Sequence, residues 1–128
     1  MKKIAVFASG SGSNAENIIT YFNKTNSAIV THVFCNNKGA KVFERCKKLD
    51  VPAILFNRND FFKSDNVLNQ LKNSVDYIIL AGFLWKIPSN LIDNFQNKII
   101  NIHPALLPKY GGKGMYGMHV HNAVKKNN

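Results

Sequence analysis

The fold is decided by the opening stretch of the chain, Lys3-Ile4-Ala5-Val6-Phe7-Ala8, and by the loop sequence that follows it, Ser9-Gly10-Ser11-Gly12-Ser13-Asn14. The first run is short, apolar and contains β-branched and aromatic residues, which is typical of a fully buried strand. The glycines after it permit a positive φ, and a helical pattern begins at Asn14. A buried strand, a glycine-rich loop and a helix predict the first unit of a parallel α/β sheet.

The same alternation of apolar runs and helical patterns continues along the chain. It predicts a doubly wound, mostly parallel sheet with helices on both faces, a Rossmann-like α/β fold. No linker or repeat interrupts the pattern, so we expect residues 1–128 to form a single domain. The predicted strands are Lys3–Ala8, Ala28–Cys35, Ala53–Phe56, Asp76–Ala81 and Lys98–Ile102, and the predicted helices are Asn14–Lys24, Ala40–Leu49, Asp60–Asn73 and a short one marked by Leu91, Ile92 and Phe95 with Ser89 as its N-cap.

Such a sheet places its ligand site at a predictable edge. Right-handed crossovers in a doubly wound order put the first and fourth strands side by side, and the chain diverges there. Ligands bind outside the carboxyl ends of the strands at that point. The loops after Ala8, Ala81 and Ile102 are therefore expected to form the site.

Composition narrows the class of protein. Lys+Arg 17 against Asp+Glu 7 gives a net charge of +10, which suggests an anionic partner. The lysines are scattered, and Arg45 and Arg58 are the only arginines, so we expect no nucleic-acid partner. Cys35 and Cys46 are too few for a disulfide framework, and no apolar run is long enough to span a membrane. We expect a cytoplasmic protein with no membrane partner.

The loop after the first strand predicts phosphate binding. Its glycines let the backbone approach a ligand closely, and the start of the next helix offers free N–H groups to an anion. A plain N-cap at Ser13 or Asn14 is the alternative interpretation. The run from Gly10 to Ala15 also fits a dinucleotide fingerprint, but the second strand ends in Asn36 and Asn37 rather than in a carboxylate that would hold the ribose. No Walker lysine follows the loop.

Asn101 and His103 are the chemically richest pair in the chain. One residue separates them, so on an extended strand end their side chains point to the same side. An amide and an imidazole in one cleft can stabilise an oxyanion and transfer a proton. The alternative is a polar strand end with a surface histidine.

Three segments carry a resemblance to a known family. Asn101-Ile102-His103-Pro104-Ala105-Leu106-Leu107-Pro108, Gly10-Ser11-Gly12-Ser13-Asn14 and Ala81-Gly82-Phe83-Leu84 resemble the folate-dependent formyltransferases. The resemblance runs from Lys3 to about Lys125. The first loop is most similar to the branch of the family that acts on phosphoribosylglycinamide in purine biosynthesis.

The resemblance implies transfer of a formyl group from 10-formyltetrahydrofolate, the co-substrate, to the amine of phosphoribosylglycinamide. It assigns Gly12, Ser13 and Asn14 to the phosphate end of the ribonucleotide. It assigns a folate pocket to the segment after the fourth strand, and a basic folate contact to the neighbourhood of Lys63 or Ser64. The residues it assigns to folate are Leu84, Trp85, Lys86, Ile87 and Asn101.

The implied mechanism is direct attack of the substrate amine on the formyl carbon, with no covalent enzyme intermediate and no metal. Asn101 would donate a hydrogen bond to the oxyanion, and His103 would stabilise it and transfer a proton. His119 and His121 have a metal-like spacing, but no carboxylate or cysteine lies near them in sequence, so we expect no metal site. The loop 111–117 is expected to close over substrate.

No Asp or Glu follows Asp93. Members of the family continue further and supply there an Asp that orients the catalytic histidine and raises its pKa. We therefore expect a chain truncated at its C-terminus and impaired in catalysis, in which the carboxylate that orients His103 is not identified. The alternatives are a non-catalytic nucleotide-binding module and an NAD-binding oxidoreductase domain. Either a monomer or a homodimer is compatible with the sequence.

Overall fold

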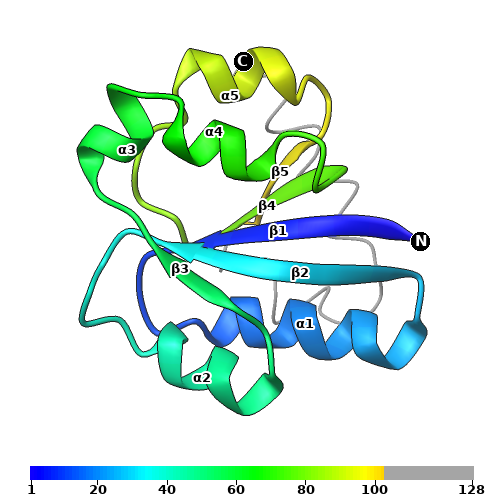
Figure 1. Ribbon diagram of the computed structural model, residues 1–128. Coiled ribbons are helices and arrows are strands. Elements are labelled where there is room, and N and C mark those ends of the chain that lie inside the picture. The colour runs from blue at the N-terminus through cyan, green and yellow to red at the C-terminus, as the bar shows by residue number, and fades with distance from the viewer. Residues whose placement is uncertain (103–128) are drawn as a thin grey trace.

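The computed structural model describes residues 1–102, which form one parallel sheet with helices on both faces (Figure 1). The strand order is β3-β2-β1-β4-β5, and every paired strand runs parallel to its neighbour. The predicted adjacency of the first and fourth strands is confirmed. The elements are β1 (Lys2–Ala8), α1 (Ser13–Thr25), β2 (Ala28–Cys35), α2 (Val42–Leu49), β3 (Ala53–Leu55), α3 (Arg58–Phe62), α4 (Asn66–Leu71), β4 (Tyr77–Ala81), α5 (Ser89–Asn94) and β5 (Ile99–Ile102).

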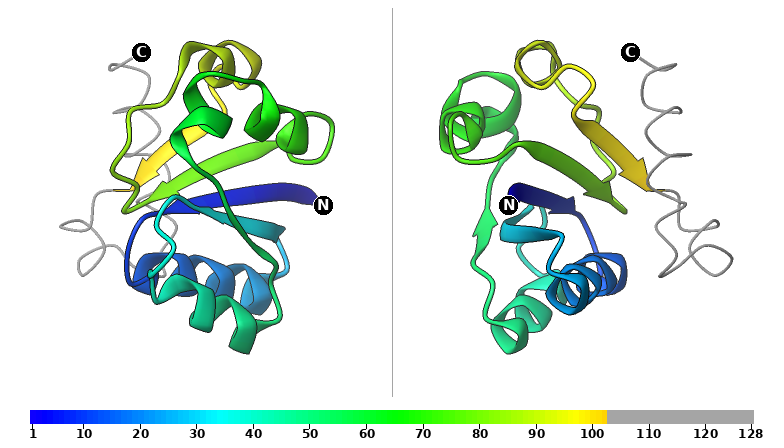
Figure 2. Two further views of the ribbon diagram at one scale, coloured as in Figure 1. Left: turned by 60° about the vertical axis from the view of Figure 1, so that its left-hand side comes forward. Right: turned by 90° about the vertical axis from the view of Figure 1, so that its right-hand side faces the viewer.

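Alternation along the strands divides the core into two apolar layers. In β1, Ile4, Val6 and Ala8 face α1 and α2, whereas Ala5 and Phe7 face the opposite side. Helices α1 and α2 lie on one face of the sheet and α3, α4 and α5 on the other (Figures 1 and 2). Both faces of the central strands are therefore buried, as the continuous apolar runs predict.

Two local predictions are wrong. The helix expected over 60–73 is two helices, because Ser64 forms side-chain hydrogen bonds with the backbone between them: its hydroxyl donates to Asp60 O (3.3 Å) and accepts from Asn66 N (3.3 Å). Ser89 is the first residue of α5 and Pro88 is its N-cap, since the fixed φ of proline suits the residue before a helix. The alternative interpretation of the first loop, an N-cap at Ser13 or Asn14, is also not what the structure has, because the N-cap of α1 is Gly12.

Candidate functional site

The carboxyl ends of β1, β4 and β5 lie level with one another. Phe7 is in register with Leu80, and Leu80 is in register with Asn101. The loop after β1, the loop after β4 and the end of β5 therefore meet at one edge of the sheet. This is the edge at which doubly wound sheets bind ligands.

The glycine loop approaches α2 closely at Gly12. This residue is buried and has φ 79°, in the left-handed region that side chains disfavour. A Cβ at this position would lie 2.4 Å from Val42 Cγ2, so only glycine fits. Helix α1 starts here without a side-chain cap from Gly12. Ser13 N donates to Ser11 Oγ at 3.4 Å, and the N–H groups that follow it in the first turn have no partner within the helix. The arrangement is suited to an anion.

Arg45 of α2 forms hydrogen bonds with the glycine loop and with the first turn of α1. Its Nε donates to Ser11 O at 2.6 Å, and its Nη1 donates to Glu16 Oε1 at 2.9 Å. Glu16 lies in the first turn of α1, where its charge would oppose a bound anion. The ion pair with Arg45 offsets that charge, and the bond from Arg45 to Ser11 O attaches the loop to α2.

Ser9 joins the loop after β1 to the loop after β4. Its buried hydroxyl accepts a hydrogen bond from Leu84 N at 3.0 Å. Its carbonyl accepts one from Asn37 Nδ2 at 3.3 Å. On the other side of the junction, Asn14 Nδ2 lies 4.0 Å from the place a Cβ on Gly82 would occupy, and Gly82 has φ 72°. The two loops are thus held together by contacts between distant parts of the chain.

The segment predicted to hold folate, Leu84–Ile87, packs on an aromatic cluster on one side and is exposed to solvent on the other. Phe83 and Trp85 join an aromatic cluster, with Phe83 5.4 Å from Phe7 and Trp85 5.8 Å from Phe56 between ring centroids. Leu84 is 82% exposed, and Lys86 is exposed. Because Leu84 N already donates to Ser9, the carbonyl of Leu84 is its remaining backbone group for a ligand.

Trp85 is also in contact with a cation. The guanidinium carbon of Arg58 lies 4.5 Å from the centroid of the Trp85 ring, a cation–π geometry. Both residues line a cavity of about 390 Å³ beyond the ends of β2 and β3, into which Lys38 and Asn57 also face. Asn36 lines the same cavity, and its Oδ1 is buried without a hydrogen-bond partner among the described residues.

Asn101 lies at the same edge of the sheet. It alternates with Ile100 and Ile102, which face α1, so it lies on the face that carries Phe83, Trp85 and Ile87. The structure therefore brings Asn101 onto the face of the sheet that carries the segment predicted to hold folate, Leu84–Ile87. Gly12, Ser13 and Asn14 belong to the neighbouring loop, which the hydrogen bond between Ser9 and Leu84 joins to that segment. His103, the loop 111–117, His119 and His121 lie outside the described residues.

The two cysteines are buried and unpaired. Burial raises the pKa of the Cys35 thiol, and burial together with the nearby Cys35 raises that of Cys46 to about 11. Both thiols are therefore protonated at neutral pH and are poor nucleophiles. Their burial is consistent with a structural role in the core.

Sequence reasoning missed Ser9, Asn37 and Arg45. A polar residue directly after a buried strand is a signal for Ser9, but its partner Leu84 is 75 residues away and the contact depends on strand order. Arg45 looks like an ordinary helix-surface cation until α2 is placed beside the glycine loop.

Comparison with known proteins identifies the class. The chain belongs to the formyl transferase family, whose profile matches residues 2–127. Among its relatives is the chloroplastic phosphoribosylglycinamide formyltransferase of Arabidopsis thaliana, 39% identical over 96% of this chain and 44% of the plant protein. The phosphoribosylglycinamide formyltransferase of Bacillus subtilis (strain 168) is 37% identical over 98% of this chain and 67% of the bacterial protein.

Solved structures agree with the fold and with the family. Glycinamide ribonucleotide transformylase 1 from Geobacillus kaustophilus superposes with a TM-score of 0.73 at 39% identity, covering 93% of this chain and 66% of that protein. The predicted Rossmann-like formyltransferase fold is therefore confirmed. The chain spans less than half the length of the plant relative and about two thirds of the bacterial ones.

Two further findings concern residues 1–102. No group of three or more His, Cys, Asp or Glu in that range is arranged to hold a metal ion. Within the same range, none of the helices combines the length and the apolar character needed to cross a membrane.

Proposed function

We propose that this chain takes part in transfer of a formyl group from 10-formyltetrahydrofolate to the amine of phosphoribosylglycinamide, a step of purine biosynthesis. The observation that carries the proposal is the hydrogen bond between Ser9 and Leu84, which joins the glycine loop after β1 to the segment after β4 in a member of the formyl transferase family. Both phosphoribosylglycinamide formyltransferases named above match the chain over almost its whole length.

In this proposal each loop holds one reactant. The first turn of α1 and the backbone at Gly12, Ser13 and Asn14 bind the phosphate of the ribonucleotide. The segment Leu84–Ile87 contacts the folate, with Leu84 offering apolar surface and backbone carbonyls offering hydrogen bonds. The Ser9–Leu84 contact keeps the two reactants at short range, which lowers the entropic cost of their reaction.

Asn101 acts on the reacting atoms. Its amide donates a hydrogen bond to the oxyanion that develops when the amine attacks the formyl carbon. His103, two residues further along the chain, is the group proposed to stabilise the same charge and to transfer a proton to the departing folate nitrogen. The chemistry uses no metal.

Single-turnover formyl transfer with enzyme in excess tests the proposal, because it detects even a slow reaction. Asn101→Ala is expected to lower the rate about 100-fold or more while the affinity for the ribonucleotide is kept. Asn69→Ala, at an exposed position of α4, is the matched control and leaves the rate unchanged. An unaltered rate in Asn101→Ala contradicts the assigned role. Failure to bind phosphoribosylglycinamide, together with saturable binding of NADH, refutes the function itself.

A further inference from the structure

The carbonyl groups of the glycine loop are held by one side of α2. Val42 and Arg45 are three residues apart, so they are neighbours on the surface of that helix. Val42 N, at the start of α2, donates to Gly10 O at 3.3 Å. Arg45 Nε donates to Ser11 O at 2.6 Å. Figure 1 shows α2 beside the start of α1, where the loop ends, so two successive peptide units of the loop have their carbonyls on α2.

The N–H groups of these two peptide units point the opposite way. In a trans peptide the C=O of one residue and the N–H of the next lie on opposite sides of the bond. Holding Gly10 O and Ser11 O on α2 therefore turns the N–H groups of Ser11 and Gly12 away from α2. Neither N–H has a hydrogen-bond partner among residues 1–102. Two adjacent N–H groups beside the start of a helix are suited to phosphate oxygens.

We propose that Arg45 is a positioning residue for phosphate binding. By holding Ser11 O it keeps the N–H of Gly12 turned outward, next to the N–H of Ser11 that Val42 orients. The affinity of the loop for a phosphate group depends on that bond. The inference rests on the proposed function for the choice of phosphate as the ligand, and it adds Ser11 N to the groups that bind it.

Arg45 acts through the loop rather than by direct contact. Its guanidinium lies on the carbonyl side of the Ser11–Gly12 peptide, and the phosphate binds on the N–H side. The same guanidinium bonds through Nη1 to Glu16 Oε1 at 2.9 Å, in the first turn of α1. A planar guanidinium can serve both acceptors at once, which fixes the Ser11 carbonyl relative to the start of α1.

Charge compensation alone is the weaker explanation for Arg45. The side chains of Arg45 and Glu16 are 35% and 42% exposed, and ion pairs with that much contact with water contribute little. The bond from Arg45 Nε to Ser11 O is short and charge-assisted. It holds a peptide unit of the loop rather than a second flexible side chain, so its loss changes where a backbone N–H points.

Amide NMR of the full chain tests the inference. Isotope-labelled protein is titrated with inorganic phosphate, and the N–H resonances of Ser11 and Gly12 report binding. We expect both resonances to shift saturably and Arg45→Met to weaken the affinity about tenfold or more, the usual effect of losing a hydrogen bond to a charged group. Lys48→Met removes the same charge from an exposed position of α2 and should change the affinity by less than about twofold. Equal losses in the two variants overturn the inference.

A double variant separates peptide orientation from charge compensation. Glu16→Gln removes the carboxylate but keeps an acceptor for Arg45 Nη1. Adding Arg45→Met to it is expected to weaken the binding of inorganic phosphate about tenfold or more relative to Glu16→Gln alone. Equal affinities would mean that Arg45 only offsets Glu16, which overturns the inference. If Arg45→Met does not fold, Arg45→Lys replaces it in both comparisons, with a loss of about threefold expected because lysine lacks the planar fork.

Phosphoribosylglycinamide in the same titration distinguishes failure of this inference from failure of the proposed function. The unaltered chain is expected to bind it with shifts at the same two N–H groups. Binding of inorganic phosphate that depends on Arg45, without binding of phosphoribosylglycinamide, supports the inference and refutes the proposed function. Binding of either compound without a shift at Ser11 and Gly12, or no binding of both, overturns the inference.

Discussion

At the scale of single residues, Gly12 is the position where backbone conformation and packing constrain each other most. Its φ of 79° disfavours any side chain, and a Cβ would lie within 3 Å of three atoms of Val42. Gly12→Ala is therefore expected to lower the free energy of unfolding by about 2 kcal/mol or more, measured from urea denaturation. The variant should also weaken ribonucleotide binding, because the loop must move to relieve the contact.

Gly10 supplies the control for that experiment. It lies in the same loop, but a Cβ there meets nothing within 4 Å and its φ is not positive. Gly10→Ala should leave stability unchanged or raise it slightly, since alanine restricts the unfolded chain. Equal destabilisation by both substitutions would show that the loop tolerates no alanine for a reason other than the geometry of Gly12.

Single residues also show which features the sequence can predict and which it cannot. The glycine loop could be predicted as an anion site because the chemistry of a strand–loop–helix junction is local. Two hydrogen bonds could not be predicted, because each joins residues far apart in sequence. They are the bond from Leu84 N to the Ser9 hydroxyl and the bond from Arg45 Nε to Ser11 O. The role of Ser9 follows only from knowing that β1 and β4 are neighbours.

At the scale of elements, the sequence predicts each strand to within one residue at either end. Their apolar runs are short and end at polar or glycine residues, which leaves little freedom in the assignment. The helices on the α3–α5 face were harder to predict. The sequence pattern predicts one helix over 60–73, but Ser64 bonds to the backbone of Asp60 and Asn66 and separates α3 from α4. There the local hydrogen bonds of Ser64 end one helix and begin another, although the hydrophobic spacing favours a single helix.

The position of His32, on β2 beside Gln70 of α4, leads to a prediction about how stability depends on pH. Burial of His32 lowers its pKa from the ordinary 6.5, although a hydrogen bond to the backbone of Gln70 in α4 opposes the shift. The unfolded chain then binds more protons than the folded chain as pH falls through about 6.5. The contribution of His32 to stability is therefore fully present above that pH and is lost below it.

His32→Gln tests this through the pH dependence of unfolding by urea. The unfolding free energy of the unaltered chain should fall between about pH 7 and pH 5, and the fall should be smaller in the variant. The other three histidines are present in both proteins, so the difference between the two curves isolates His32. Parallel curves would mean that His32 titrates alike in the folded and unfolded chain.

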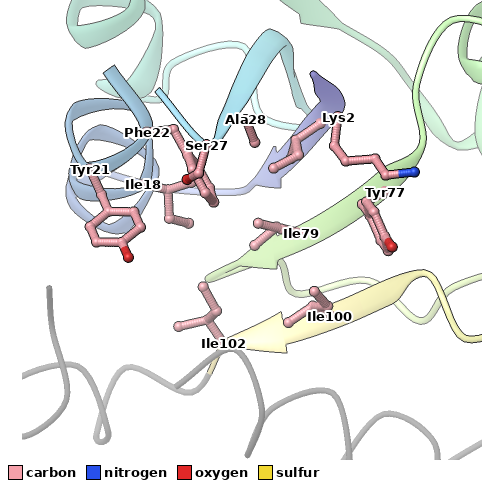
Figure 3. Close-up of a pocket in the computed structure, with 11 residues that line it drawn as sticks. Lys2, Ile18, Tyr21, Phe22, Ser27, Ala28, Tyr77, Ile79, Ile100 and Ile102 are labelled. Carbon is pink, nitrogen blue, oxygen red and sulfur yellow. The ribbon is translucent and has the colours of Figure 1, made fainter. Parts of the chain in front are cut away.

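At the scale of the whole molecule, the sheet order explains how three short motifs become one site. Glycines of the first loop, the segment after β4 and Asn101 at the end of β5 are separated along the sequence but adjoin at one edge of the sheet. This could be predicted, because right-handed crossovers restrict the order of strands. The apolar groove beside α1, which Tyr21, Tyr77 and Ile100 line (Figure 3), could not be predicted from the sequence. It depends on how far each helix extends over its face of the sheet.

The net charge of +10 gives the last prediction. A phosphate-bearing substrate is attracted by the field of the whole chain, and salt screens that attraction, with a Debye length near 10 Å at 0.1 M and 3 Å at 1 M. We expect phosphoribosylglycinamide to bind about threefold to tenfold more weakly by calorimetry at 1 M NaCl than at 0.1 M. The analogue without its phosphate is the control, and its affinity should change little. If both compounds lost affinity equally, the phosphate would not be the group that the basic chain attracts, and the assignment of the glycine loop would fail with it.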